Sequence, residues 1–314
     1  MTQQAPRIVS LLPSATEIVC ALGLADSLVG VTHECDYPHG IERKPALTAS
    51  RITQQTMSSA EIDHAVRSQL DGHGCIYELD TNRLRSLAPD LILTQELCEV
   101  CAVSYHTVER AARLLAGDVT IISLEPATIA DILGNIVAVG EMTGRRAEAD
   151  AVVGRLRARI DALTALLSGI MHRPRTLVLE WLEPAFAPGH WVPEQVALAG
   201  GDSGFGTVGA PSRVTTAKEI TAYAPEVIVL APCGFSTTDT FRQLPRARLP
   251  AGWPELTAVR DGNVWAVDAT SYFSRPGPRV VDGAEILARI LHPEVAGLPE
   301  QSHARRVPPE LMRL

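Results

Sequence analysis

One pattern of apolar and polar positions occurs twice along the chain. Residues 84–93 place Leu84 and Leu87 at helical spacing ahead of Ala-Pro-Asp and an apolar run, and residues 220–229 repeat this with Ile220, Tyr223 and Ala-Pro-Glu. In each copy an amphipathic helix end leads through an acidic residue into a short β run, which is typical of a helix-to-strand step in an α/β unit. The repetition predicts two lobes of the same kind.

Short apolar runs predict the strands of each lobe. They lie at 7–12, 28–32, 90–94 and 119–124 in the first lobe and at 176–180, 226–231 and 263–267 in the second. Helical patterns alternate with these runs, so we expect an α/β fold with two Rossmann-like lobes and mainly parallel sheets. We expect an irregular tail beyond Pro293, and Trp253 and Trp265 in the core.

The first predicted helix carries start and stop signals. Ser14 and Glu17 have the spacing of a capping box, in which the two side chains satisfy backbone N–H groups at a helix start. Gly23 follows where a residue with positive φ is wanted, so we expect the helix to end there.

Residues 128–168 keep a helical spacing of apolar positions, and we expect one long α-helix that joins the lobes. Gly140 and Gly144 each weaken a helix by about 1 kcal/mol relative to alanine, so two shorter helices broken near Gly144 are the alternative. The predicted organisation is an N-terminal lobe at 1–125, a linker helix at 126–170 and a C-terminal lobe at 171–314.

Composition narrows the class of protein. The 314 residues are 46% hydrophobic and 20% charged, as in soluble globular proteins. The formal charge of -8, without clusters of Lys and Arg, argues against a nucleic-acid partner. No stretch reaches the roughly 20 apolar residues that a membrane span needs.

The first strand is expected from residue 7, which leaves no room for an export signal ahead of it, and we therefore expect a cytoplasmic protein. A periplasmic or other extracytoplasmic location is expected if a leader has been removed. The six cysteines, at 20, 35, 75, 98, 101 and 233, do not suggest a disulfide framework and suit a reducing compartment.

Unusual residues follow the carboxyl ends of the predicted strands. They occupy 33–38 and 95–101 in the first lobe, and 180–181, 189–194, 232–235 and 271–275 in the second. Open parallel sheets place their ligand sites at this edge, so we expect the functional site between the lobes.

Two kinds of site fit these residues. Aromatic rings at Tyr37, Trp181, Trp191, Tyr272 and Phe273 suit a large planar ligand. Thiolates and imidazoles suit a zinc ion or an iron–sulfur cluster, for which the candidate ligands are Cys35, Cys98, Cys101, Cys233 and His33. A single CxxC pair is weak evidence for a metal, because free cysteines are also often buried as small apolar residues.

Catalysis has little support in the sequence. The chain has no G-x-S-x-G elbow, no H-E-x-x-H motif and no phosphate-binding glycine loop. We therefore do not expect an enzyme.

Several motifs, taken in order along the chain, carry a family resemblance. They are Arg7-Ile-Val-Ser-Leu-Leu-Pro-Ser-Ala-Thr-Glu17, Val29-Gly30-Val31, Asp36-Tyr37-Pro38, the 84–90 phrase, Gly140-x-x-x-Gly144, Ala199-Gly200-Gly201 and Arg275-Pro-Gly-Pro-Arg279. With these motifs the chain resembles the solute-binding proteins of ABC importers whose lobes are joined by a single helix, the class III periplasmic binding proteins, and in particular the vitamin B12-binding type.

The resemblance implies a ligand held between the lobes in a largely preformed cleft, with Tyr37, Phe273 and Arg275 as contacts and Phe186 and Tyr272 as further candidates. The chain also departs from the B12-binding pattern. Ser212 stands where a tryptophan is expected. Asn82 and Lys218 stand where permease-docking glutamates are expected, although Asp80 and Glu219 are adjacent.

The leading hypothesis is non-enzymatic binding of a corrinoid such as cobalamin, or of a related metal chelate, by a monomer that serves an ABC permease. The predicted ligand-binding residues are Glu34, Tyr37, Gln95, Glu96, Trp181, Phe186, His190, Trp191, Tyr272, Phe273 and Arg275. The second hypothesis is a metal- or cluster-binding protein that uses the cysteines, and the third is an enzyme that acts on such a ligand.

Overall fold

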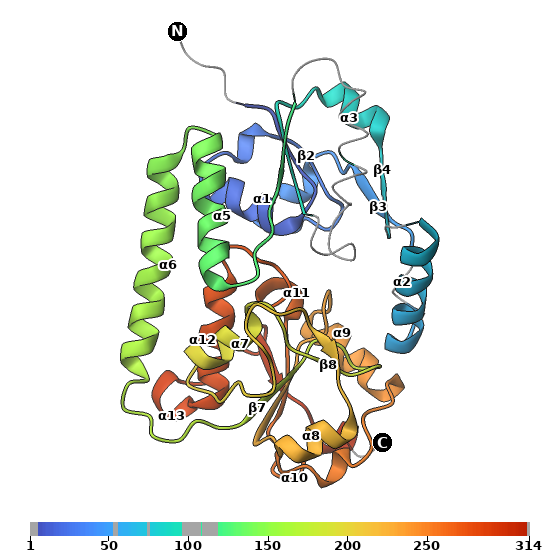
Figure 1. Cartoon of the computed structure of the whole chain (residues 1–314), viewed down its shortest axis with the longest axis vertical. Helices are drawn as coiled ribbons and strands as arrows, with labels where there is room; N and C mark the ends of the chain where they lie inside the picture. The colour runs from blue at the N-terminus through green and yellow to red at the C-terminus, as the bar shows by residue number, and fades with distance from the viewer. Residues whose placement is uncertain (1–5, 53–55, 74–75, 96–107, 109–118, 313–314) are drawn as a thin grey trace. The chain divides into compact units, whose positions relative to one another are not determined.

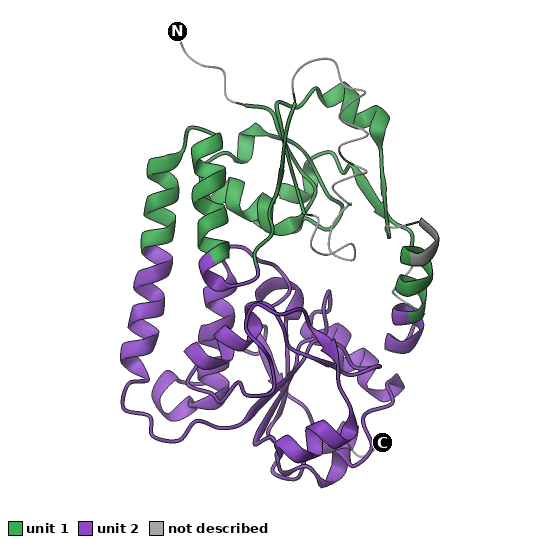
Figure 2. Cartoon of the chain, in the orientation of Figure 1, with its two compact units in different colours: residues 1–56, 64–126, 131–154 green, residues 57–63, 127–130, 155–314 purple. Residues whose placement is uncertain are grey.

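A computed structural model describes residues 6–52, 56–73, 76–95, 108 and 119–312. The chain divides into two compact units, coloured separately in Figure 2. Unit 1 comprises residues 1–56, 64–126 and 131–154, and unit 2 comprises residues 57–63, 127–130 and 155–314. Among the described helices, none combines the length and the apolar character needed to cross a bilayer.

Unit 1 is built on a four-stranded parallel sheet in the order β2-β1-β5-β6. Its strands are Leu28–Val31 (β2), Ile8–Ser10 (β1), Leu91–Thr94 (β5) and Thr120–Ser123 (β6). A second, antiparallel pair joins β3 (Thr48–Ser50) to β4 (Tyr77–Leu79). The helices that accompany these strands are α1 (Pro13–Ala21) and α3 (Thr81–Leu87), with short 3₁₀ turns at Ala25–Ser27 and Ile41–Arg43. α2 (Ser59–His73) begins in unit 2 and continues into unit 1 from residue 64.

Unit 2 has a sheet in the order β12-β11-β10-β7. β7 (Thr176–Leu179), β10 (Val227–Leu230) and β11 (Val264–Val267) are parallel, and β12 (Ala304–Arg306) is antiparallel. β8 (Phe186–Ala187) and β9 (Arg213–Val214) form a separate antiparallel pair. The helices, labelled in Figure 1, are α7 (Val192–Leu198), α8 (Ala217–Tyr223), α9 (Thr237–Gln243), α10 (Thr257–Arg260), α11 (Ala269–Tyr272), α12 (Val280–Leu291) and α13 (Pro293–Ala296).

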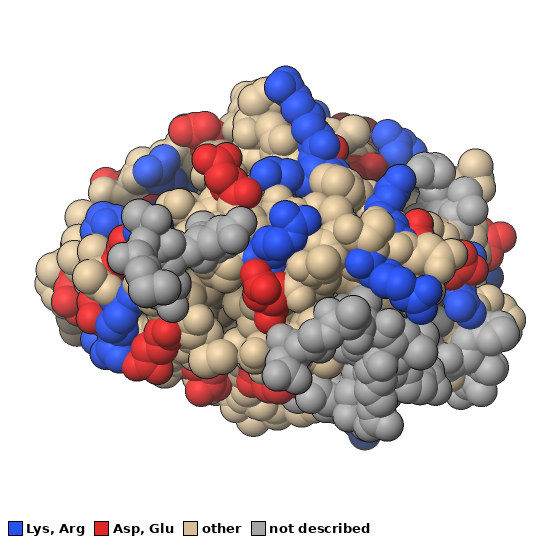
Figure 3. Space-filling model, turned by 90° about the horizontal axis from the view of Figure 1, so that it is seen from above, with Lys and Arg blue, Asp and Glu red and all other residues tan. Residues whose placement is uncertain are grey.

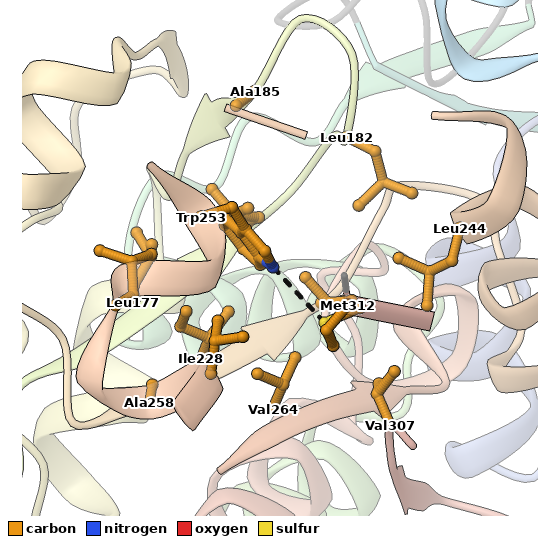
Figure 4. Packing of buried hydrophobic residues seen from close by; sticks show 14 of the residues in the cluster. Leu177, Leu182, Ala185, Ile228, Leu244, Trp253, Ala258, Val264, Val307 and Met312 are labelled. Atoms are coloured by element: carbon orange, nitrogen blue, oxygen red, sulfur yellow. Dashed lines mark hydrogen bonds between the residues drawn. The ribbon is translucent and has the colours of Figure 1, made fainter. Parts of the chain in front are cut away.

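The core of unit 2 gathers apolar side chains from its three parallel strands around Trp253. The Trp253 indole is 2% exposed, and its Nε1 lies 3.5 Å from Met312 Sδ (Figure 4). Trp265 is also buried. The expected core positions of both tryptophans are therefore confirmed, as is the expected class of fold with two α/β lobes and mainly parallel sheets.

The repeated sequence phrase is also a structural repeat. α3 and α8 both end at an alanine with positive φ, Ala88 at 40° and Ala224 at 50°. The acid that follows accepts the backbone N–H of an arginine that leads into the neighbouring strand: Asp90 Oδ2 lies 2.8 Å from Arg7 N, and Glu226 Oε2 lies 3.0 Å from Arg175 N.

The arginine side chains close each repeated step. Arg7 Nε donates to the Leu87 carbonyl at 2.9 Å, and Arg175 Nε donates to the Ala224 carbonyl at 2.8 Å. Each arginine thus satisfies a carbonyl at the C-terminus of the repeated helix, where the helix itself supplies no donor.

The expected single long helix is wrong. The segment forms two helices, α5 (Ile129–Met142) and α6 (Arg146–Leu166), as the alternative break near Gly144 predicts. Gly144 has φ of 69°, which a side chain would strain, and the Cα of Gly140 lies so close to α6 that an added Cβ would come 2.5 Å from Ala149 Cβ. The two glycines therefore allow the chain to reverse and the helices to pack closely, side by side in Figure 1.

Two smaller expectations also fail. α1 begins at Pro13 with Leu12 as its N-cap, so Ser14 and Glu17 lie inside the helix and form no capping box, because proline supplies the preorganised first turn. Gly23, with φ of 73°, does follow the helix end as expected. The tail beyond Pro293 is not irregular, because β12 pairs with β11 and places the Arg306 guanidinium over the Trp265 ring at 5.0 Å.

Arg159 on α6 ties this helix to α12 within unit 2. Its Nε and Nη2 donate to Glu285 at 2.9 and 2.8 Å, and Nη2 also donates to Asp282 at 2.9 Å. The hydrogen bonds to Glu285 raise the pKa of Arg159 above its ordinary value, so the pair stays charged.

Replacing Arg159 with alanine should lower the free energy of unfolding by about 1–2 kcal/mol, because a bidentate ion pair across two helices is lost while its side chains are only partly exposed. Urea denaturation followed by tryptophan fluorescence measures this change. Arg157→Ala, on the exposed side of the same helix, is the control and should change stability by less than about 0.5 kcal/mol. Equal effects of the two variants would contradict the role of the Arg159 contacts.

Candidate functional site

In unit 1, the loop after β2 holds an ordered polar cluster. His33 Nδ1 lies 2.7 Å from Thr48 Oγ1, which also accepts the His33 backbone N–H at 3.0 Å. Tyr77 donates from its hydroxyl to Glu34 Oε1 at 2.9 Å, and its ring meets that of His33 at 5.6 Å. The short β3–β4 pair, which supplies Thr48 and Tyr77, therefore positions both His33 and Glu34.

Other predicted residues of unit 1 differ in exposure. Tyr37 is 47% exposed, and its contact with a ligand stays a prediction. Gln95 is buried at the end of β5. Cys35 is buried too, and its Sγ lies 3.0 Å from Thr16 Oγ1. Glu96, Cys98 and Cys101 lie outside the described residues.

In unit 2, Glu180 stands directly after β7. Its carboxyl accepts the Gly189 N–H at 3.2 Å and a hydrogen bond from the Ser212 hydroxyl. Part of the residue's surface is accessible, whereas the carboxyl group itself is closely surrounded by protein atoms. Loss of hydration around the carboxyl raises the pKa of Glu180 to about 7, against the lowering effect of these two donors.

Trp181 follows Glu180 in the sequence, and His190 follows Gly189, whose N–H donates to the Glu180 carboxyl. His190 is half-buried, and burial lowers the pKa of its imidazole, which favours the neutral form. The Trp181 ring packs against Phe235 at 5.2 Å, and its Nε1 donates to the carbonyls of Ser59 at 3.2 Å and Glu183 at 3.1 Å. Phe186 keeps part of its ring accessible, and its backbone N–H donates to the Trp181 carbonyl.

Trp191, Phe273 and Arg275 are buried within unit 2, at 8%, 2% and 7% exposure. Trp191 Nε1 donates to the Phe273 carbonyl at 2.9 Å, so these two residues brace one another from α7 and from the end of α11. Their burial indicates a supporting role beneath the surface, and their direct contact with a ligand stays a prediction.

Tyr272 is the most accessible of the predicted residues in this stretch. The Arg279 guanidinium lies over its ring at 5.5 Å, and the His303 ring meets it at 5.1 Å. Gln195 fixes the backbone here, because its Nε2 donates to the carbonyls of Tyr272 at 2.9 Å and Val280 at 2.8 Å.

The metal hypothesis gains no support from the described residues. Within them, no three His, Cys, Asp or Glu side chains come together in a group that would hold a metal ion. Cys35 is buried against Thr16, and Cys233 is exposed on the loop after β10.

On the face drawn in Figure 3, the described Lys and Arg side chains are interspersed with Asp and Glu and form no continuous basic stripe.

Glu180 is the residue that the sequence analysis left out of the predicted site. The sequence did carry a signal for this residue, because an acid directly after the buried strand β7 lies at the carboxyl edge of a parallel sheet. What the sequence did not contain is the close packing of Gly189 and Ser212 around the carboxyl.

The pKa of Glu180 implies a pH dependence of stability. Because the folded-state pKa is raised to about 7 from 4.5, the folded state holds the proton more tightly than the unfolded state does. The resulting contribution to the free energy of unfolding is fully present below about pH 4.5 and is lost as pH rises through 7. Relative to Glu180→Gln, the wild-type protein should lose about 1–2 kcal/mol of unfolding free energy between pH 5 and 8, a figure reduced for the accessible part of the residue.

Chemical denaturation across this pH range measures the difference. The control is Glu183→Gln, whose carboxyl instead accepts the Arg248 N–H at 2.8 Å, and it should follow the wild-type curve. Parallel curves for wild type and Glu180→Gln would refute the assignment.

Comparisons with known proteins place this arrangement in a family. The chain is 25% identical over 284 residues to a vitamin B12-binding protein of Vibrio cholerae, covering 90% of this chain and 87% of the relative. It is 25% identical over 297 residues to an uncharacterized ABC transporter substrate-binding lipoprotein of Bacillus subtilis, covering 92% and 80%.

A crystal structure of a periplasmic heme-binding protein from Pseudomonas aeruginosa superposes with a TM-score of 0.71 at 18% identity, over 96% of this chain and 99% of that one, which shows a shared fold. The family model described as periplasmic binding protein matches residues 8–270. Because this match spans more than half of the chain, the protein belongs to the periplasmic binding protein family.

Proposed function

We propose that the protein is the substrate-binding component of an ABC importer and that its ligand is a metal chelate of the tetrapyrrole type, a corrinoid or a heme. The observation that carries the proposal is the presence, in a chain of this family, of accessible aromatic side chains at the carboxyl edges of both sheets. These are Tyr37 in unit 1 and Trp181, Phe186 and Tyr272 in unit 2.

Ring faces suit such a ligand because a flat macrocycle buries a large apolar area against them at low entropic cost. Polar groups beside the rings would orient the ligand's side groups. In unit 1 these are His33 and Glu34, both held in place by β3 and β4, and in unit 2 it is His190.

The choice between corrinoid and heme rests on the relatives. Relatives of similar sequence are named vitamin B12-binding protein, and proteins of similar structure are named periplasmic heme-binding protein. Ser212 supports a ligand other than cobalamin itself, because it replaces the expected tryptophan and its hydroxyl is used by Glu180. The predicted placement of the ligand between the lobes stays a prediction.

A permease partner follows from the importer role. The acids beside the expected docking positions are already used as helix caps: Asp80 Oδ1 accepts the Arg83 N–H at 2.9 Å, and Glu219 pairs with Thr216 in a capping box. Hydrogen bonds from Thr216 lower the pKa of Glu219 to about 2, so this acid stays ionised, and it already pairs with Arg213 at 2.8 Å. No step of the proposed function requires catalysis.

Location is part of the same proposal. The names of the relatives, periplasmic or lipoprotein, favour a place outside the cytoplasm.

Titration with hemin, cyanocobalamin and dicyanocobinamide should give saturable binding of at least one of them at low micromolar concentration, seen as a shift of the ligand's visible bands and quenching of tryptophan fluorescence. Replacing Tyr37 or Trp181 with alanine should weaken that binding about tenfold, the effect of losing roughly 1.4 kcal/mol of ring contact.

The control for this titration is Phe241→Ala. The Phe241 ring lies under Arg305, 4.5 Å from its guanidinium carbon, on α9, and it is outside the predicted site. The Phe241→Ala variant should bind as the wild type does. If none of the three chelates binds the folded protein at a concentration roughly 50-fold above the expected low micromolar range, the proposed ligand class is wrong.

A further inference from the structure

The Glu180 carboxyl joins two loops that are distant in sequence. One is the His190 loop, residues 187–191, which leads from β8 into α7, and the other is the Ser212 loop, residues 209–212, which leads into β9. One carboxyl oxygen accepts the Gly189 N–H at 3.2 Å, and the other accepts the Ser212 hydroxyl.

The two loops are in direct backbone contact beside this carboxyl. His190 N donates to the Ala210 carbonyl at 2.7 Å, and Gly209 N donates to the His190 carbonyl at 2.9 Å. A Cβ on Gly189 would lie 2.3 Å from Ser212 N and 2.5 Å from Ala210 O, so only glycine allows this approach. His190 itself is held with φ of 49°, a conformation that a non-glycine residue rarely adopts without support from its surroundings.

No cation neutralises the carboxyl among the described residues that contact it. The interactions that act on it come from Ser212 and Gly189 alone. The other ionisable groups near these elements are engaged otherwise: Arg213 pairs with Glu219 at 2.8 Å, Glu183 accepts the Arg248 N–H, and Cys233 donates only its backbone N–H to the Glu180 carbonyl. His190 favours its neutral form because it is half-buried.

We propose that Glu180 is a proton-operated positioning residue: when neutral it holds the His190 loop closed on the Ser212 loop, and when ionised it releases the two loops from one another. Its effect on ligand affinity, exerted through His190, rests on the proposed function. The closing of the loops does not.

The proton balance follows from the two hydrogen bonds. In the neutral acid, the hydroxyl donates to Ser212 Oγ and the carbonyl oxygen accepts the Gly189 N–H. In the ionised acid, Ser212 donates instead, and two donors satisfy only about half of the lone-pair sites of a carboxylate. Water must then reach the carboxylate, and the accessible part of Glu180 gives it a path once the loops part. The raised pKa of Glu180, about 7, places this change near neutral pH.

Amide hydrogen exchange of the intact chain tests, without any ligand, whether neutral Glu180 holds the His190 loop on the Ser212 loop, a contact that we call the clamp. After correction for intrinsic rates, the protection of the Gly189 and His190 amides should fall by about tenfold or more between pH 6 and 8.5 in the wild type, since one unit of pKa difference corresponds to tenfold. Glu180→Gln should keep high protection at both pH values, because the amide oxygen accepts from Gly189 and the amide NH₂ donates to Ser212, as the neutral acid does.

The matched control is Glu183→Gln, in the turn that follows β7, which should behave as the wild type does. Constant protection in the wild type, or the same pH dependence in Glu180→Gln, would overturn the proposal.

The same variants test the link to binding. The affinity of the wild type for hemin or cyanocobalamin, divided by that of Glu180→Gln at each pH, should fall several-fold from pH 6 to 8.5, and the ratio cancels any titration of the ligand. A constant ratio with pH-dependent exchange would confirm the clamp and overturn its effect on affinity. Failure of hemin, cyanocobalamin and dicyanocobinamide alike to bind would remove the proposed function and that effect, while hydrogen exchange would still decide whether Glu180 holds the two loops together.

Discussion

Parallel strand order is the constraint on which the rest of this protein depends. Strands that run the same way must be joined by crossovers, and their carboxyl ends then share one edge. In both units the amino-terminal edge of the sheet is stabilised by the same pair of hydrogen bonds. An arginine side chain donates to a carbonyl at a helix C-terminus, and an acid accepts the backbone N–H of that arginine. Because the amino ends are fixed in this way, the loops at the carboxyl edges are free to differ, and they carry the residues of the candidate site.

The two carboxyl edges use different means to order their polar residues. In unit 1 an added antiparallel pair, β3 and β4, supplies the side chains that hold His33 and Glu34. In unit 2 the sheet's own strand end supplies Glu180, and two loops close around it. A carboxyl without a cation is costly to ionise in such surroundings, so this edge combines order with sensitivity to protons.

Glycine decides where the connecting helices turn. Helical spacing continues through residues 128–168, yet the helix is interrupted at Gly144, and α5 packs closely against α6 at Gly140. Periodicity reports which face of a segment is apolar, and it does not report whether a reversal allows that face to be buried better. Propensity costs of about 1 kcal/mol per glycine are small beside the burial gained when two helices pack.

The sequence by itself determined the parallel strands of both sheets, the repeat, the helix end at Gly23 and the family resemblance, because hydrophobic period, Ala-Pro-acid steps and glycine conformations are local signals. Only the tertiary structure decided that Trp191, Phe273 and Arg275 are buried, that Ser14 and Glu17 form no capping box, and that residues 304–306 complete a sheet. It also revealed Glu180 as the centre of a two-loop contact. Burial and pKa depend on which distant segments crowd a side chain, and this crowding follows from packing that no local pattern encodes.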